Sequence, residues 1–407
     1  MGNIWNIYWT HRGREPKNHR MTKPARFKPA TSETGDPLLL TPGPLTTSAS
    51  VKQAMDHDWG SRDAEFLRIN RMVLDKIVEL AGGQGTHVTV PVQGSGTFAV
   101  EAMITSFVPK SGKLLVLING AYGQRALKIA QIAGRATASL ETPEDTPPDL
   151  VRLDRMLSDD KAISHVFAVH CETTSGILNP IAEVAEITAR HGRRLLVDSM
   201  SAFGALEIDA RQIRYDALAA SSNKCLEGVP GLGFVVCRNE ALAECKGNAT
   251  TLVLDLFDQA EAFMRTGQYR FTPPIHVIVA LGKAIEEHAA EGGVAGRGKR
   301  YRENAGVLID GMRAMGFRTL LPDHLQAPII VTFHMPTDPK FVFQRFYDAL
   351  KDRGYVIYPG KLTVADSFRI GCIGRLYPQH MEGALLAVRE VLDEMRVSNG
   401  GPALAAE

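Results

Sequence analysis

From about residue 50 onward, short apolar runs alternate with helix-like stretches, and this alternation constrains the fold of the 407-residue chain more than any other feature. The apolar runs predict strands at residues 88–92, 113–119, 165–170, 194–198, 217–221 and 233–237. Helical patterns occupy residues 63–80, 97–107, 124–133, 181–191 and 275–291. Because a strand–helix–strand connection places its two strands in parallel, the pattern predicts an α/β fold with a doubly wound, mainly parallel sheet.

The length of the chain and a change of composition near residue 293 predict a second domain. A single hydrophobic core stops growing at about 250–300 residues. We therefore expect a large domain at residues 36–290, in which residues 36–60 pack on the small domain, and a smaller α+β domain at residues 291–400. The elements predicted for the small domain are a helix opened by the charged stretch at 296–301, a strand at 328–333, a helix at 338–353, strands at 356–358 and 367–371, and a helix at 381–395.

Residues 1–35 are interpreted as an extension outside both domains. Residues 1–20 are rich in arginine, poor in acidic residues and lack the apolar segment of a secretion signal. Three interpretations stay open: a disordered extension, a transit peptide, or a start assigned too far upstream, with Met21 as the better initiator methionine.

Charge and cysteine content exclude several kinds of partner. Lys and Arg total 46 and Asp and Glu 45, so the net charge of +1 creates no field that attracts nucleic acid or an anionic membrane. The longest apolar runs, such as residues 114–118, are far below the ~20 residues of a membrane span. The five cysteines are scattered and lack Cys-x-x-Cys spacing, which argues against structural zinc and disulfides and predicts a cytoplasmic protein without a metal site.

Lys224 and Asp198 are the main candidates for catalysis. Lys224 follows the buried-looking strand at 217–221, where burial lowers the pKa of the amine and makes it a nucleophile that forms an imine with an aldehyde cofactor. Asp198 ends the strand at 194–198, where a carboxylate keeps a pyridine nitrogen protonated, although taken alone it also suits a helix cap. Polar residues at the other strand ends agree with a ligand at this edge of the sheet: Ser95, Asn119, His170 and Ser222.

A glycine-rich turn at residues 94–97 has the features of a phosphate site. The sequence Gly-Ser-Gly-Thr lies between a strand and a helix, where backbone N–H groups and the hydroxyls of Ser95 and Thr97 can hold one phosphate. A dinucleotide fingerprint would need a glycine where Ala99 stands and an acidic residue where Asn119 ends the next strand, which disfavours a nicotinamide dehydrogenase. Together with Lys224 and Asp198, the turn predicts a pyridoxal-phosphate enzyme.

Three further residues are weaker candidates. Tyr122 is flanked by glycines after a strand, and it is either an exposed loop residue or an aromatic plate stacked on a cofactor ring. Thr173 can bond the ring hydroxyl or form part of a plain turn. Arg369 lies between apolar neighbours in a strand of the second domain, where it needs an anionic partner from a substrate or from a structural ion pair.

The chain resembles the class V aminotransferases of the aspartate-aminotransferase-like fold, also called pyridoxal-phosphate fold type I, over roughly residues 37–396. The segments that carry the resemblance are residues 40–46 (LTPGPLT), 58–63 (DWGSRD), 94–97 (GSGT), 119–125 (NGAYGQR), 170–180 (HCETTSGILNP), 198–201 (DSMS), 223–225 (NKC) with 228–231 (GVPG), 271–274 (FTPP) and 368–371 (FRIG).

The resemblance implies a role for each site residue. Lys224 would bind the cofactor covalently, Asp198 would hold its ring nitrogen and Tyr122 would stack on the ring. Thr272 would reach the phosphate of the neighbouring subunit, which implies a homodimer with shared sites. The resemblance also implies that the phosphate is held by Ser95, Gly96, Thr97 and Asn223, and that the substrates are bound by Gly43 and Arg369.

Within this family the resemblance is greatest to the members that transfer an amino group from 2-aminoethylphosphonate to pyruvate, giving phosphonoacetaldehyde and alanine, a step of phosphonate catabolism. An alanine–glyoxylate or serine–pyruvate aminotransferase is the alternative, because an arginine suits a phosphonate and a carboxylate alike. A desulfurase is disfavoured because Cys372 lies in an apolar strand pattern rather than a mobile loop. A regulator is disfavoured because no DNA-binding pattern accompanies the fold.

Overall fold

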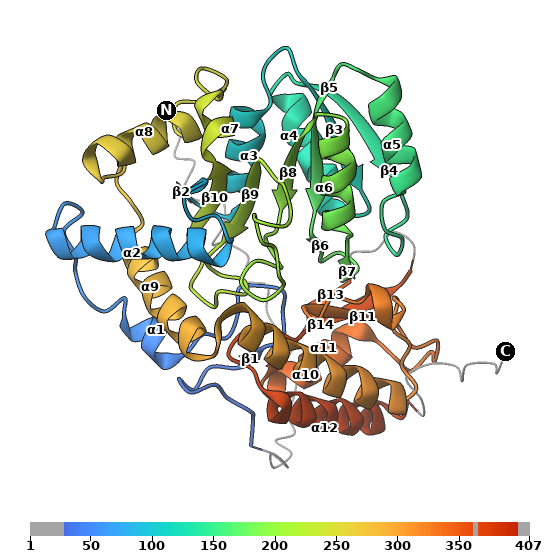
Figure 1. Ribbon diagram of the computed structural model, residues 1–407. Helices are drawn as coiled ribbons and strands as arrows, with labels where there is room; N and C mark the ends of the chain where they lie inside the picture. Colours follow the sequence, from blue (N-terminus) through green and yellow to red (C-terminus); the bar gives the residue numbers. More distant parts are fainter. Residues whose placement is uncertain (1–27, 361–364, 398–407) are drawn as a thin grey trace, which may run out of the picture.

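The computed structural model describes residues 28–360 and 365–397 (Figure 1). At its centre is a seven-stranded sheet in the order β2-β10-β9-β8-β5-β3-β4, in which only β10 runs against its neighbours. The α/β class and the mainly parallel sheet are therefore confirmed. The strands are β2 (His87–Gln93), β3 (Lys113–Ile118), β4 (Ala136–Glu141), β5 (Ile163–Val169), β8 (Arg194–Asp198), β9 (Ala217–Ser221) and β10 (Leu232–Arg238).

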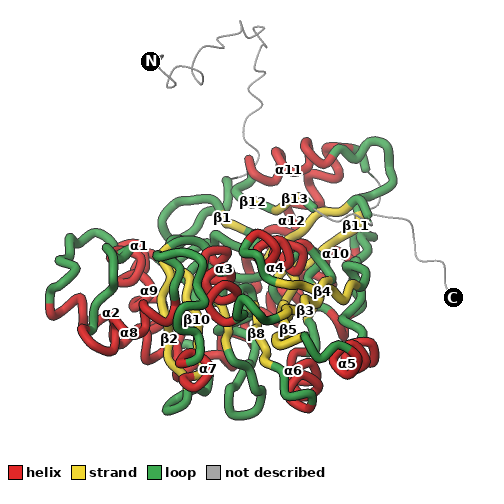
Figure 2. Tube along the Cα trace, turned by 90° about the horizontal axis from the view of Figure 1, so that it is seen from above, coloured by secondary structure: helices red, strands yellow, loops and turns green. Residues whose placement is uncertain are grey.

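Helices cover both faces of this sheet, and the view from above shows the strands between them (Figure 2). Buried apolar residues at helical spacing, such as Phe66, Val73 and Ile77, fix the inward face of a helix because each contributes about 1.5–3 kcal/mol on burial. One face carries α2 (Ala64–Leu80), α5 (Leu150–Asp159), α6 (Ile181–Arg190) and α9 (Ile275–Ala290). The other carries α3 (Gly96–Phe107), α4 (Ala121–Ile132), α7 (Asn239–Ala243) and α8 (Leu256–Thr266).

The C-terminal region, residues 293–397, has its own hydrophobic core around Phe333, Phe346 and Phe368. Its antiparallel sheet has the order β11-β14-β13. The elements are α10 (Gly293–Ala314), a 3-10 helix (Asp323–Leu325), β11 (Ile330–His334), α11 (Phe343–Asp352), β12 (Tyr355–Val356), β13 (Tyr358–Pro359), β14 (Ser367–Gly371) and α12 (Pro378–Met395).

The N-terminal segment lies against the C-terminal region. Strand β1 (Leu38–Leu39) pairs in parallel with β12, and Leu40 joins the same core. The backbone N–H of Ala30 donates to the Arg353 carbonyl at 2.9 Å, so residues 28–35 of the predicted extension also make contacts there. Residues 1–27 lie outside the described part of the chain. The remaining elements are α1 (Ala49–Gln53), β6 (Cys171–Glu172) and β7 (Ile177–Leu178).

Several elements differ from the prediction for identifiable reasons. Strand β4 was not predicted because it lies at the edge of the sheet and is half exposed, so its sequence lacks a continuous apolar run. Helix α10 begins at Gly293, and the charged stretch at 296–301 lies inside it rather than marking a boundary. Because α9 and α10 follow each other with two residues between them, the division of the chain at residue 290 stays a prediction.

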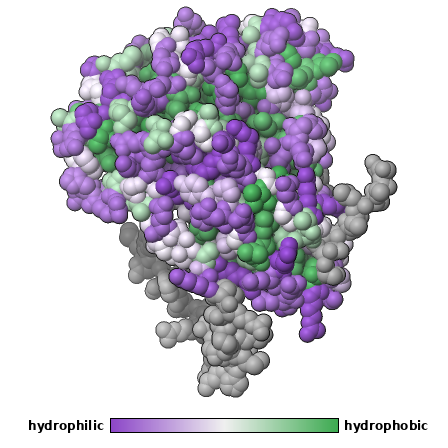
Figure 3. All heavy atoms as spheres, turned by 60° about the horizontal axis from the view of Figure 1, so that its bottom comes forward, coloured by the Kyte–Doolittle hydropathy of each residue, from purple (hydrophilic) through white to green (hydrophobic). Residues whose placement is uncertain are grey.

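Most of the face shown in Figure 3 is hydrophilic, and hydrophobic residues form small patches within it. No helix in the described ranges is long and apolar enough to cross a membrane. Nor do the described residues contain a group of three or more His, Cys, Asp or Glu that could hold a metal ion. All five cysteines are buried and unpaired.

Candidate active site

A cavity of about 220 Å³ opens where β8 and β9 end. Eight residues predicted from the sequence line it: Gly43, Ser95, Gly96, Thr97, Tyr122, Asp198, Asn223 and Lys224. Five residues that the prediction did not include line it as well: Val100, Arg125, Ala126, Met200 and Ser221. A larger hollow of about 610 Å³ between α2 and α8 contains none of the predicted site residues, so the smaller cavity is the candidate active site.

Lys224 reaches the cavity from the turn that follows β9. Its Nζ donates a hydrogen bond to the Pro42 carbonyl at 2.7 Å, and burial lowers the pKa of the amine to about 8. The backbone of Gly43 passes so close that a Cβ atom there would lie 2.8 Å from Nζ. Gly43 also has φ +118°, in the region that favours glycine, so this contact excludes other residues.

Asp198 ends β8, the strand beside β9, so its carboxylate and the Lys224 turn lie at the same edge of the sheet. Its Oδ1 accepts the backbone N–H of Met200 at 2.9 Å. Burial raises the pKa of the carboxyl to about 6. No ion-pair partner of Asp198 or Lys224 occurs in the described ranges.

The N-terminus of α3, where the sequence predicts a phosphate site, lines the cavity. Ser95 is the N-cap, and its side chain makes no capping hydrogen bond, so the hydroxyl is available to a ligand. The first N–H groups of an α-helix lack an acceptor four residues back, so this end of α3 is suited to bind an anion. At Gly96 a Cβ atom would lie 2.3 Å from the Met200 sulfur, so a larger residue there would displace the Met200 side chain.

Tyr122 lies in the first turn of α4, not in the loop expected from its flanking glycines. Its backbone N–H donates to Glu172 Oε2 at 3.1 Å, which holds the first turn of α4, and Tyr122 lines the cavity. Burial raises the pKa of the phenol. The Arg125 guanidinium lies 4.9 Å from the ring centre and donates to the Thr97 hydroxyl at 3.3 Å.

Arg369 and Thr173 contact each other but do not line this cavity. The Arg369 guanidinium donates to the Thr173 carbonyl at 2.6 Å and to the Pro359 carbonyl at 2.9 Å, and it lies 4.8 Å from the centre of the Tyr358 ring. Within the described chain Arg369 forms no ion pair with a carboxylate. The structural ion pair that the sequence left open as an alternative is therefore not formed. Burial lowers the pKa of this guanidinium.

Thr272 is exposed in the segment before α9 and does not line the cavity of its own chain. Its role therefore stays a prediction that depends on a second subunit.

The polar residues that sequence reasoning missed are Ser221 and Arg125, which line the cavity, and Glu172, which bonds to Tyr122 behind its wall. Ser221 ends β9, and its buried hydroxyl has no hydrogen-bond partner in the described chain. The position of Ser221 at a strand end, one strand from Asp198, is the signal that could have found it. Glu172 is fully buried and holds the first turn of α4 through Tyr122, a contact across 50 residues that no local pattern indicates.

The family comparison agrees with this geometry. The model of the class V aminotransferases matches residues 29–360, and the chain belongs to this family. A relative from Pseudomonas putida named 2-aminoethylphosphonate–pyruvate transaminase is 53% identical over 361 residues, which cover 89% of this chain and 98% of the relative. A relative of the same name from Cupriavidus necator is 51% identical over 367 residues, or 90% of this chain and 97% of the relative.

Solved structures of aminotransferases share the fold. A pyridoxamine–pyruvate aminotransferase from Mesorhizobium loti aligns with a TM-score of 0.82 at 24% identity, over 90% of this chain and 94% of that one. An aspartate aminotransferase from Thermus thermophilus aligns with a TM-score of 0.79 at 23% identity, over 88% and 99%. The predicted aspartate-aminotransferase-like fold is therefore confirmed.

The residues present fit pyridoxal phosphate, the cofactor of this family. The cavity offers an amine with a lowered pKa, an unpaired carboxylate and a helix N-terminus. The buried hydroxyl of Ser221, which has no hydrogen-bond partner in the described chain, is available in the cavity as well. The buried hydroxyl of Thr173 lies beside the Tyr122 phenol, outside the lining of the cavity. A ligand with an aldehyde, a basic ring nitrogen and a phosphate would satisfy all of these groups.

Proposed function

We propose that the protein transfers the amino group of 2-aminoethylphosphonate to pyruvate, giving phosphonoacetaldehyde and L-alanine, with pyridoxal phosphate as cofactor. The observation that carries the chemistry is the meeting of Lys224, Asp198 and the N-terminus of α3 in one cavity. The choice of substrates is supported by relatives named for this reaction that match nearly their whole length.

Lys224 transfers the protons of the reaction, and Asp198 keeps the ring nitrogen of the cofactor protonated. When bound, pyridoxal phosphate supplies an aldehyde carbon that carries the amino group and a ring that accepts the electron pair of the broken C–H bond. The Lys224 amine, with its pKa lowered to about 8, removes a proton from the donor carbon that bears nitrogen and later returns one to C2 of pyruvate. The Asp198 carboxylate is ionised above about pH 6 and keeps the ring nitrogen protonated.

The remaining residues orient the cofactor. The N–H groups at the start of α3, the hydroxyls of Ser95 and Thr97 and the side chain of Asn223 hold the phosphate. Tyr122 packs against the ring, and Thr173 donates to the ring hydroxyl. These contacts fix the face of the ring that meets Lys224 and exclude water from it.

Arg369 binds the anionic end of each substrate. Its guanidinium is buried and bonded to backbone carbonyls, so it is positioned but not neutralised by a carboxylate in the described chain. A forked guanidinium can pair with a phosphonate or a carboxylate through two N–H···O bonds, which allows one residue to serve both half-reactions. Gly43 permits the close approach of backbone to the lysine at the substrate side of the cavity.

We also propose a homodimer in which Thr272 completes the neighbouring site. Support comes from Phe271, next to Thr272, and from Phe98, next to Thr97, whose side chains are 47% and 50% exposed in the single chain. Mixing Lys224→Ala and Thr272→Ala subunits tests this arrangement. If the sites are shared, the mixed dimer contains one intact site and its activity exceeds that of both parents; if each subunit keeps its own Thr272, mixing gives only the average.

A role in phosphonate catabolism and a cytoplasmic location complete the proposal. The location is supported by the five unpaired, buried cysteines, which suit a reducing compartment. Fractionation of the source cells and growth on 2-aminoethylphosphonate as sole phosphorus source test these two points.

Single-turnover spectroscopy of the holoenzyme tests the reaction itself. With equal concentrations of donors, 2-aminoethylphosphonate should discharge the absorbance of the bound aldehyde form near ~420 nm far faster than serine, glycine or aspartate. Arg369→Lys should slow both half-reactions, by about 2–4 kcal/mol of transition-state binding, because a point charge replaces a planar fork. A faster reaction with serine or glycine would assign the protein to the alternative, a serine–pyruvate or alanine–glyoxylate aminotransferase.

A further inference from the structure

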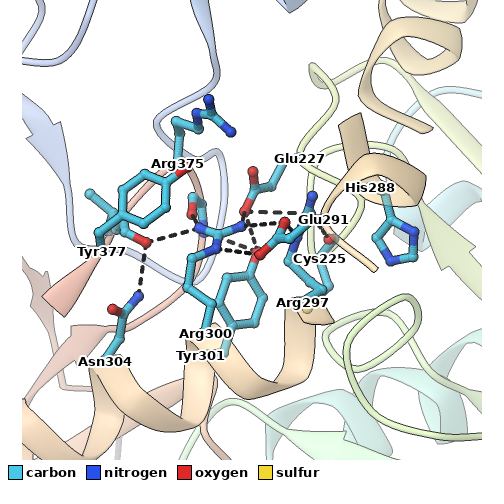
Figure 4. Close-up of polar contacts among 12 residues, drawn as sticks. Cys225, Glu227, His288, Glu291, Arg297, Arg300, Tyr301, Asn304, Arg375 and Tyr377 are labelled. Carbon is cyan, nitrogen blue, oxygen red and sulfur yellow. Dashed lines mark hydrogen bonds and ion pairs between the residues drawn. The ribbon is translucent and has the colours of Figure 1, made fainter. Parts of the chain in front are cut away.

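A second group of buried charges lies outside the cavity (Figure 4). Its hydrogen bonds reach the turn that carries Lys224 and the chain that follows β14, the strand of Arg369. We call it the α10 cluster, and it consists of Glu227, Glu291, Arg297, Arg300 and Tyr301. Arg297 and Tyr301 are 1% and 0% exposed, and Arg300 is 6% exposed. The α10 cluster takes no part in the chemistry proposed above, so its purpose needs an explanation of its own.

The α10 cluster holds the lysine segment, residues 221–228. Arg297 Nη1 donates to the Cys225 carbonyl at 2.5 Å, one residue after Lys224. Glu227 has φ +59°, a left-handed conformation that is unfavourable for a residue with a side chain. Its backbone N–H donates to the Lys224 carbonyl at 2.8 Å, while its Oε1 accepts from Arg300 at 2.8 Å and from the Tyr301 hydroxyl at 2.5 Å. The side-chain bonds of Glu227 therefore maintain the turn that presents Lys224.

Residues of α10 also hold the segment that contains Arg369, residues 367–376, which we call the arginine segment. Arg300 Nη1 donates to the carbonyls of Gly374 at 2.5 Å and Leu376 at 2.9 Å. The Tyr301 hydroxyl accepts the backbone N–H of Gly374 at 3.2 Å. Asn304, one turn further along α10, donates to the Cys372 carbonyl at 3.0 Å. These bonds anchor the chain just after β14, the strand that contains Arg369.

The Tyr301 hydroxyl is the point where the two segments meet. It donates to Glu227 of the lysine segment and accepts from Gly374 of the arginine segment, so one oxygen atom is bonded to both. Arg300 makes a parallel connection, because its two Nη atoms bond to Glu227 and to the Gly374 carbonyl. A shift of either segment must break bonds shared with the other.

We infer that the α10 cluster sets the position of Lys224 relative to Arg369, so that Tyr301, Arg300 and Glu227 are positioning residues for catalysis. The amine that moves the proton and the guanidinium that binds the anionic end must be separated by the length of the substrate, and an error of about 1 Å can cost about 100-fold in rate. The inference rests on the proposed function only in assigning Arg369 to the substrate.

Tyr301→Phe removes the shared oxygen and leaves the ring in place, so it is the variant of choice. In the cofactor-free protein, hydrogen exchange followed by mass spectrometry should show faster exchange in both the lysine segment and the arginine segment. In the holoenzyme, kcat/KM for 2-aminoethylphosphonate should fall at least tenfold. Combined with Arg369→Lys, the loss should be smaller than the product of the two single losses, because both variants disturb one distance.

Arg313→Ala is the matched control. It breaks an ion pair of the same helix, but this pair lies at the surface. Arg313 Nη2 and Asp323 Oδ1 are 2.6 Å apart, and the two side chains are 38% and 73% exposed. It should change neither the exchange of the two segments nor kcat/KM. If Tyr301→Phe does not fold, Arg300→Lys provides the same test, since a single ammonium nitrogen cannot replace two Nη atoms, of which one bonds to two carbonyls and the other to Glu227.

Three results would overturn the inference: faster exchange in one segment only or in neither, an unchanged kcat/KM, or single losses that multiply. If the wild type itself fails with 2-aminoethylphosphonate, the proposed function fails, but the exchange measurement needs no substrate and still decides the inference. In that case the kinetic measurement uses the half-reaction that converts alanine to pyruvate.

Discussion

The cavity and the α10 cluster both bury charged side chains, but these side chains have ion-pair partners only in the α10 cluster. In the cavity, Asp198 and Lys224 have no ion-pair partner in the described chain, and burial moves the pKa of each toward the neutral form, to about 6 and about 8. In the α10 cluster every guanidinium meets a carboxylate. Burial alone would raise the pKa of Glu291, but Arg300 and Arg297 lower it to about 2.

The presence or absence of an ion-pair partner indicates whether a buried charge serves ligand binding or fixes the local geometry. A buried charge without a partner destabilises the fold, so it persists where a ligand supplies the missing partner. A buried charge with good partners keeps its ionisation over the whole physiological range and gives a fixed geometry instead. Substitutions in the two regions should therefore have opposite effects on the free energy of unfolding.

The largest effect is expected for Lys224→Ala. The variant should lose at least about 10⁴-fold in kcat, about 5.5 kcal/mol, because no other amine reaches the reacting carbon. Its free energy of unfolding without cofactor should not fall, since the removed amine is an unpaired buried cation. Steady-state assays and urea denaturation check the two parts, and wild-type turnover would remove Lys224 from the mechanism.

Arg300→Met should show the reverse pattern in stability. Removing Arg300 leaves the two carboxylates of Glu227 and Glu291 with the single guanidinium of Arg297, so one buried negative charge loses its partner, which typically costs about 3–5 kcal/mol. Urea denaturation of the cofactor-free protein measures this loss. A variant as stable as the wild type would mean that ion pairs do not stabilise the α10 cluster, which would contradict the difference between the two regions.

Asp198→Asn should stabilise the cofactor-free protein in a pH-dependent way. The carboxyl has its pKa raised from 3.8 to about 6, so its destabilising effect is absent at low pH, develops between these two values and is complete above about pH 6. The two-unit difference corresponds to about 3 kcal/mol at pH 7.5 and roughly half of that at pH 5. Asn keeps an oxygen for the Met200 N–H, so the local turn is preserved. A gain that does not grow with pH would contradict the assigned cause.

The smallest effect is expected for Asp323→Ala, which breaks the exposed pair with Arg313. Pairs of this kind contribute about 0–1 kcal/mol and are screened by salt. The free energy of unfolding should change by less than about 1 kcal/mol, and less again in 1 M salt. A change as large as that of Arg300→Met would show that burial is not what distinguishes the α10 cluster.

The same comparison explains what the sequence could and could not predict. Lys224 and Asp198 were predictable because each stands at the end of an apolar strand, a position visible in the local pattern. The charged stretch at 296–301 was interpreted only as the start of a helix, since nothing local shows that Arg300 is buried. Its partner Glu227 lies 73 residues away, and only the folded chain brings the two together.

The contact of Gly43 and Pro42 with Lys224 has a consequence for the order in which the protein is made. This wall of the cavity is synthesised before the large sheet, but β1 beside it pairs with β12, and the Leu40 carbonyl accepts the backbone N–H of Gly371 at 2.9 Å. Both partners leave the ribosome more than 300 residues later. The large sheet can assemble during translation, whereas the N-terminal wall docks only near its end. A nascent chain stalled before residue 355 should therefore contain Lys224 and Asp198 in a folded sheet and still bind the cofactor poorly.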